Sequence, residues 1–100
     1  MRRYTPPPSV AHAAAHALDL RAMLPPSRRC CTPAGLRMAR RLAAREPLTE
    51  SELRKLWSYH QRHAVDRRAP GWGLDSKGYQ ASLAWGGDAG ERWAARVLDR

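Results

Sequence analysis

Apolar residues recur at spacings of three and four along most of the chain, which is the pattern of helices with one buried face. A first helix is expected over residues 10–24, after Ser9 as its N-cap; its inward positions are Val10, Ala14, Ala17, Leu18 and Leu24. A second is expected from the cap Thr32, followed by Pro33, to about residue 45; its inward positions are Leu36, Ala39, Leu42 and Ala43.

The strongest helix start lies at residues 48–53. Thr49 is the expected cap, Glu52 completes a capping box, and Leu48 and Leu53 occupy the two positions of a hydrophobic staple. This third helix is expected to run to about residue 66, with an inward face formed by Leu53, Leu56, Trp57, His60 and Ala64.

Two shorter helices are expected after a loop over residues 67–75. Ser76 caps the fourth, in which Tyr79, Leu83 and Ala84 pack, and Trp85-Gly86-Gly87 ends it. Asp88 and Glu91 form a second capping box that opens the fifth helix, whose inward residues are Trp93, Val97 and Leu98. Trp85 and Trp93 are expected to be buried on either side of this glycine-rich turn.

The residue types favour an all-α fold. Phe and Ile are absent and Val occurs three times, whereas Ala occurs 17 times, Arg 16 times and Leu 11 times. We expect a small single-domain bundle of about five short helices over residues 9–100, preceded by an extended, basic, Pro-rich arm at residues 1–8. The apolar runs are too short to span a membrane, and no signal-peptide pattern is present.

Charge indicates a polyanionic partner. The net charge is +9, and residues 1–45 hold nine basic residues against one acid, whereas residues 46–100 hold nine against eight. The expected phosphate-binding residues are the N-terminal arm, the connector between the first two helices, and the outer face of the second helix: Arg2, Arg3, Arg28, Arg29, Arg37, Arg40 and Arg41. Arg45 continues that stripe. Solvated helix faces or coding bias would also explain the arginines.

Trp72 lies between Pro-Gly and Gly and is an optional stacking contact for a base. A lid over a thin, Ala-rich core explains it equally well.

Other candidate chemistry is weak. His60, His63 and Asp66 lie along one side of the third helix but supply too few ligands for a metal site. We expect His60 to pack in the core and His63 to bond to Asp66 or the following loop. No nucleophile with a neighbouring base is visible, so the sequence predicts no enzyme, no metal and no cofactor.

Cys30 and Cys31 are adjacent in sequence. Because a bridge between neighbours needs an unusual backbone, two free thiols in a reducing compartment are expected.

Residues 32–94 resemble a small helical module that recurs in proteins of tailed bacteriophages. The most specific match is the closing segment, with Gly78-Tyr79, Ala81, Leu83, Trp85-Gly86-Gly87-Asp88-Ala89-Gly90 and Trp93-Ala94. Earlier matches include Thr32, Gly35, Ala39-Arg40, Leu42, Ser58-Tyr59, Arg62-His63 and Asp66. The chain departs from the pattern at His60, where an aromatic residue is usual, and at Cys30-Cys31 and Pro33, which replace a glycine-rich entry. The resemblance implies an accessory or targeting role in a viral protein.

Together these observations predict a non-enzymatic nucleic-acid-binding accessory protein of phage or prophage origin, with DNA as its partner. The alternative is a structural or assembly component of a virion that contacts packaged genome or an acidic protein. Host cytoplasm or the virion is the expected location, and no membrane partner is expected.

Overall fold

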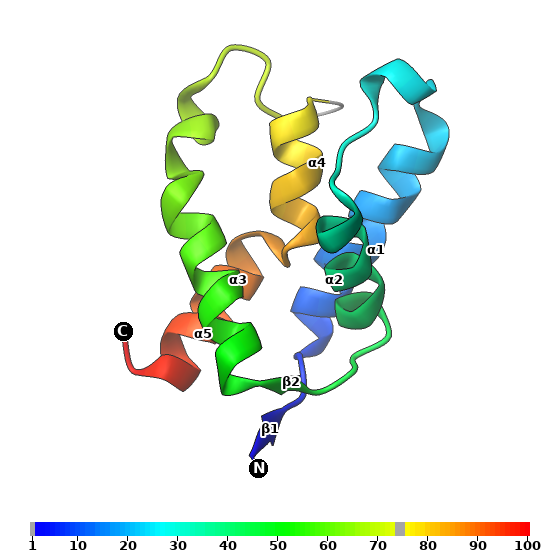
Figure 1. The fold of residues 1–100 in the computed structure, drawn as a ribbon. Helices are drawn as coiled ribbons and strands as arrows, with labels where there is room; N and C mark the ends of the chain where they lie inside the picture. Colours follow the sequence, from blue (N-terminus) through cyan, green and yellow to red (C-terminus); the bar gives the residue numbers. More distant parts are fainter. Residues whose placement is uncertain (1, 74–75) are drawn as a thin grey trace.

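A computed structural model describes residues 2–73 and 76–100 and confirms the all-α fold (Figure 1). Over these residues the elements, in chain order, are β1 (Arg3–Tyr4), α1 (Pro8–Met23), the 3-10 turn η1 (Pro26–Arg28), α2 (Pro33–Ala43), β2 (Leu48–Thr49), α3 (Glu50–Arg62), the 3-10 turn η2 (Ala64–Arg68), α4 (Lys77–Ala84) and α5 (Gly87–Leu98).

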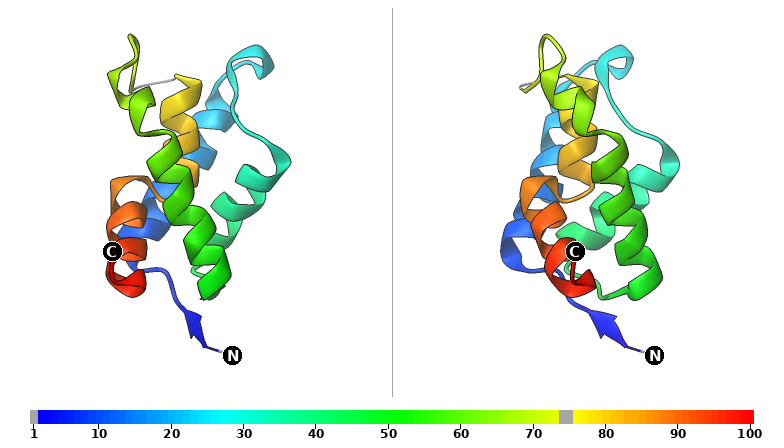
Figure 2. Two further views of the ribbon diagram at one scale, coloured as in Figure 1. Left: turned by 60° about the vertical axis from the view of Figure 1, so that its left-hand side comes forward. Right: turned by 90° about the vertical axis from the view of Figure 1, so that its left-hand side faces the viewer.

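Helix α1 is the centre of the bundle. It packs against α2, α4 and α5, whereas α3 packs chiefly against α5. In Figure 1, α3 lies to one side of α4, and α1 and α2 lie to the other. The turned views in Figure 2 place the connector between α1 and α2 at the end of the molecule opposite to β1. The bundle is therefore elongated, with extents of 40 × 26 × 21 Å.

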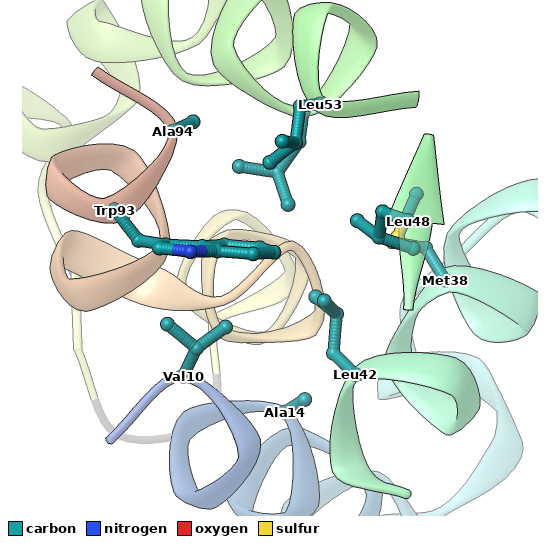
Figure 3. Close-up of a cluster of buried hydrophobic side chains, with 9 residues drawn as sticks. Val10, Ala14, Met38, Leu42, Leu48, Leu53, Trp93 and Ala94 are labelled. Carbon is teal, nitrogen blue, oxygen red and sulfur yellow. The ribbon is translucent and has the colours of Figure 1, made fainter. Parts of the chain in front are cut away.

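The main core gathers side chains from α1, α2, β2, α3 and α5 (Figure 3). Its buried members are Val10, Ala14, Met38, Leu42, Leu48, Leu53, Leu56, Trp93 and Ala94. The Trp93 indole lies in the middle of this group, between Val10 and the leucines. Burial of each large side chain contributes roughly 1.5–3 kcal/mol. Trp93 is buried as predicted, whereas Trp85 is only half-buried.

The N-terminal arm is extended but it is not free. Residues Arg3–Tyr4 pair antiparallel with Leu48–Thr49, and Pro6 is fully buried. The Arg45 Nε donates a hydrogen bond of 2.8 Å to the Pro6 carbonyl oxygen. Helix α1 begins at Pro8, two residues before the expected start, because a proline at the first helical position has no amide to satisfy. Ser9 is therefore inside the helix and is not its cap.

Three of the predicted caps are present. Thr32 accepts from the Gly35 amide, Ser76 accepts from the Tyr79 amide, and Thr49 and Glu52 form the full capping box. Helix α3 ends at Arg62, and the 3-10 turn η2 follows it where a continuation to about residue 66 was expected.

The prediction of a second capping box, at Asp88 and Glu91, is wrong. Helix α5 begins at Gly87, and its cap is Gly86, which has a φ of +94° and makes no side-chain cap. Asp88 lies inside the first turn, and its carboxylate pairs with Arg67 at 3.1 Å. A Cβ built on Gly90 would lie 2.8 Å from the Trp85 carbonyl oxygen, so this turn needs glycine for close backbone approach.

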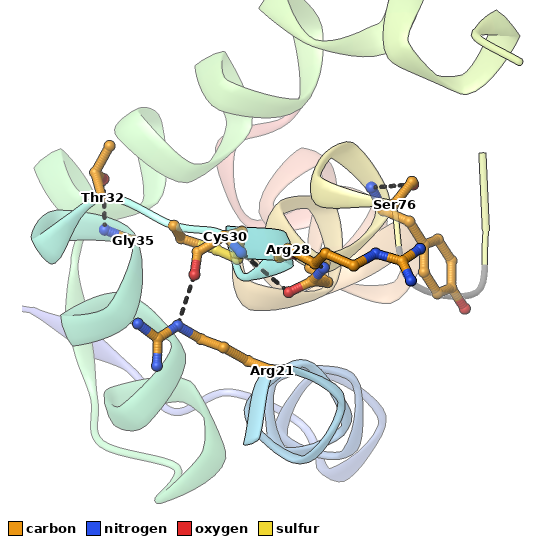
Figure 4. Close-up of a disulfide and its surroundings, with 9 residues drawn as sticks. Arg21, Arg28, Cys30, Thr32, Gly35 and Ser76 are labelled. Carbon is orange, nitrogen blue, oxygen red and sulfur yellow. Dashed lines mark hydrogen bonds between the residues drawn. A yellow bond between two sulfur atoms is a disulfide. The ribbon is translucent and has the colours of Figure 1, made fainter. Parts of the chain in front are cut away.

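The expectation of two free thiols is also wrong. Cys30 and Cys31 are joined by a disulfide, and the peptide bond between them is cis (Figure 4). The cysteines therefore give no support to a reducing compartment.

Candidate nucleic-acid interface

The arginine stripe predicted for the second helix divides into two pairs, although Arg45 lies just beyond the end of α2. Arg37 and Arg40 are exposed, and neither has an ion pair within the described part of the chain. Arg41 and Arg45, in contrast, bond to other segments of the protein. Only half of the predicted stripe is therefore available to a partner.

Arg41 joins the end of α2 to the start of α3. Its guanidinium pairs with Glu52 and donates a hydrogen bond of 3.1 Å to the Pro47 carbonyl oxygen. A second carboxylate, from Glu46, lies 3.8 Å from the Arg41 Nε. The hydrogen bond from Arg41, with that from the Thr49 amide, lowers the pKa of the Glu52 carboxyl to about 2. The same contact raises the pKa of Arg41. This predicted phosphate contact is engaged inside the fold.

The connector that carries Arg28 and Arg29 is tied to α1 and α4. The Arg29 Nε donates to the Leu24 carbonyl oxygen at 2.7 Å, and the Arg21 Nε donates to that of Cys30 (Figure 4). Gln80 is fully buried and bonds the connector twice, accepting from the Cys30 amide at 3.1 Å and donating to the Arg28 carbonyl oxygen at 3.0 Å. Sequence reasoning missed Gln80, because nothing in its sequence neighbours marks a buried amide.

The predicted basic residues extend along the molecule and do not form one patch. Arg2 and Arg3 lie at the β1 end, where the Arg2 guanidinium is 5.6 Å from the Tyr4 ring centroid. Arg28 and Arg29 lie at the opposite end, and α2 lies between the two ends (Figures 1 and 2). A length of 40 Å corresponds to about 12 phosphates of one DNA strand.

Trp72 is half-buried. Its ring meets Tyr79 edge to face, with centroids 5.4 Å apart and an interplanar angle of 86°. A Cβ on Gly78 would lie 3.6 Å from the Trp72 ring. This contact ties the loop before α4 to that helix.

His60 of α3 and His63, which directly follows this helix, have the structural contacts expected of them. His60 is 2% exposed, and its Nε2 donates to the Trp85 carbonyl oxygen at 2.9 Å. Burial lowers the pKa of His60. The His63 Nδ1 lies 3.0 Å from the Asp66 carboxylate. Among the described residues no three His, Cys, Asp or Glu side chains are grouped as metal ligands.

The structure also forms a cationic groove that the sequence did not indicate. It has a volume of 580 Å³ and lies between the connector, α3 and α4; its lining includes Arg29, Thr32, Tyr59, Arg62, Lys77 and Trp85. An adjoining hollow of 400 Å³ shares Arg62 and Trp85 with it and continues along α3 past Ser58 to Lys55 and Arg54. Four of these cations, Arg54, Lys55, Arg62 and Lys77, come from the half of the chain in which the charges nearly balance.

No family model, curated protein or solved structure matches the chain. Within the described residues, no helix is both long and apolar enough to cross a membrane.

Proposed function

We propose that this chain is a non-enzymatic nucleic-acid-binding protein that contacts the phosphate backbone of DNA. The observation that carries the proposal is the pair Arg37 and Arg40, exposed on α2 with no acidic partner within the described residues. Arginine presents a planar fork of donors that matches a phosphate group. Such contacts position a protein on DNA without reading its sequence.

The distribution of acids supports the same proposal. Within the described part of the chain, five carboxylates of the C-terminal half are paired to three arginines: Arg41 with Glu46 and Glu52, Arg54 with Glu50, and Arg67 with Asp88 and Glu91. Within the described residues, the excess of cations is therefore left at the surface, with Arg37 and Arg40 of α2 among them. Arg2, Arg3 and Arg29 would extend the contact along the DNA.

The resemblance to tailed-phage modules supports a phage or prophage origin and a location in the host cytoplasm or the virion. It equally supports the competing candidate, a virion assembly component whose basic face touches packaged genome or an acidic protein. The two differ in solution, since a DNA-binding protein shifts a duplex probe by itself, whereas an assembly component copurifies with a shell or tail protein.

The test is a titration of duplex DNA at several salt concentrations. Each phosphate contact contributes a slope of about 0.9 to the dependence of log K on log salt. The double variant Arg37→Gln/Arg40→Gln should therefore flatten that slope by about 1.8. Both side chains are exposed, so thermal unfolding should be unchanged.

The matched control is Arg92→Gln/Arg96→Gln, which removes the same charge from exposed positions on α5. A specific α2 surface predicts a smaller effect of this control. If the two double variants lost equal DNA affinity, the effect would be one of net charge and not of a specific α2 surface. If the unmodified protein bound no DNA near physiological salt, the assembly component would become the favoured candidate.

A further inference from the structure

The groove between the connector, α3 and α4 combines aromatic and cationic surface. In Figure 1, α3 and the connector lie on either side of α4, so three segments far apart in sequence supply the lining. Its volume of 580 Å³ falls within the range of about 300–1,000 Å³ that is typical of ligand pockets.

A fixed stack of rings borders the groove. Tyr59 lies between Trp85, with centroids 5.0 Å apart and planes 10° apart, and His63, with centroids 4.4 Å apart. Tyr59 is only 6% exposed, so the rings are held in place by packing. Trp85 is half-buried and lines both the groove and the adjoining hollow. A nucleobase can stack on such a surface whatever its identity.

Cations surround this aromatic surface. Arg62 and Lys77 are exposed and have no ionic partner in the described part of the chain. The Arg29 guanidinium is held in position through its bond to the Leu24 carbonyl oxygen. Among the described residues that line the groove, Asp66 is the only acidic one, and its carboxylate already bonds to His63. The groove therefore favours a ligand that carries several negative charges.

We propose that this groove binds single-stranded nucleic acid, with phosphates on Arg62, Lys77 and Arg29 and a base against Trp85. This inference rests on the proposed function and adds a second site to it. A duplex keeps its bases stacked inside and offers this surface only phosphates, whereas a single strand offers phosphates and bases together. The adjoining hollow continues the path along α3 to Lys55, so that successive phosphates can follow the helix.

The experiment compares two double variants that each remove two exposed charges, Arg62→Gln/Lys77→Gln in the groove and Arg37→Gln/Arg40→Gln on α2. The probes are a fluorescein-labelled dT oligomer of about ten nucleotides, within the usual site size of single-strand binders, and a labelled duplex. Anisotropy titrations at several salt concentrations give both affinities, and circular dichroism checks that each variant is folded.

The groove variant should lose at least about tenfold in affinity for the dT oligomer near 0.1 M salt and flatten its salt slope by about 1.4, since each single-strand contact contributes about 0.7. Its affinity for duplex should change much less, and the α2 variant should show the opposite pattern. Equal loss of oligomer affinity in both variants would overturn the groove site and leave the proposed function standing. No binding of either probe by the unmodified protein would overturn both proposals. Oligomer binding through the groove without an α2 effect on duplex would support the groove and overturn the α2 surface.

Discussion

Arg40 and Arg41 are neighbours in sequence, but their guanidinium groups have different surroundings. Successive helical residues point about 100° apart, so one side chain can face solvent while the next reaches the adjoining segment. Arg40 is exposed, whereas Arg41 contacts Glu52 and the Pro47 carbonyl oxygen. A stripe of like residues on a helix is therefore divided by what the neighbouring segment offers.

Arg41→Gln should lower the free energy of unfolding by about 1 kcal/mol, because it removes charge-assisted hydrogen bonds from a partly exposed carboxylate that also caps α3. Urea unfolding at neutral pH measures this loss. Arg40→Gln is the matched control and should leave stability unchanged. If both variants were as stable as the unmodified protein, the ion pair between Arg41 and Glu52 would not contribute to stability.

At the scale of elements, local and tertiary causes determine different helix ends. Thr49 and Ser76 were predicted as caps because a cap is made within four residues. The start of α5 was not predicted correctly, because it depends on packing against a distant part of the chain. A Cβ on Gly86 would lie 3.0 Å from the Val10 side chain and 2.9 Å from the Gly90 Cα. The contact with Val10 of α1 is one that the local sequence does not contain.

His60 couples α3 to this same turn, and it should make stability depend on pH. Burial holds its folded pKa below the ordinary 6.5, while the acidic groups facing it are Glu91 and Asp88, and Arg67 is the facing cation. The unfolded chain then binds more protons, so stability is complete above about pH 6.5 and is lost as pH falls toward the folded pKa. The slope should approach about 1.4 kcal/mol per pH unit.

Urea unfolding between pH 7.5 and 5.5 measures this slope. His60→Gln should flatten it, because an amide can still donate to the Trp85 carbonyl oxygen but does not titrate. His12→Gln, at an exposed position of α1, is the control and should leave the slope of stability against pH unchanged. A slope that survives in His60→Gln would assign the titration to another group. The loss linked to Glu52 is separate, since it occurs as pH falls from 4.5 toward about 2.

At the scale of the whole molecule, the fold was more predictable than the site. Helix periodicity and residue type predicted the bundle, and Leu42, Leu53, Leu56 and Trp93 are buried as expected. The sequence also predicted that the first half carries most of the basic charge. It did not predict the groove, because charge summed over half a chain hides which acids are paired. Nor did it indicate that segments around residues 30, 60 and 80 meet.

The main core, which is shared by α1, α2, β2, α3 and α5, predicts that the bundle unfolds as one unit. Trp93 is 5% exposed at its centre. Trp93→Ala should cost roughly 3–5 kcal/mol, a large part of the stability of a domain this small. In urea titrations followed by near- and far-ultraviolet circular dichroism, both signals of the unmodified protein should change at the same midpoint.

Trp72→Ala is the matched control, since it removes the same side chain from a half-buried position against Tyr79, outside the core. It should cost less than half as much, because the loss scales with the apolar area taken from contact. If Trp93→Ala unfolded at the same urea concentration as Trp72→Ala, the α5 tryptophan would not be the element that joins the helices. Separate midpoints for the two signals would mean that α4 and the connector unfold on their own. These segments are held by Gln80 and by a smaller buried cluster of Ala17, Ala39 and Ala84, outside the main core.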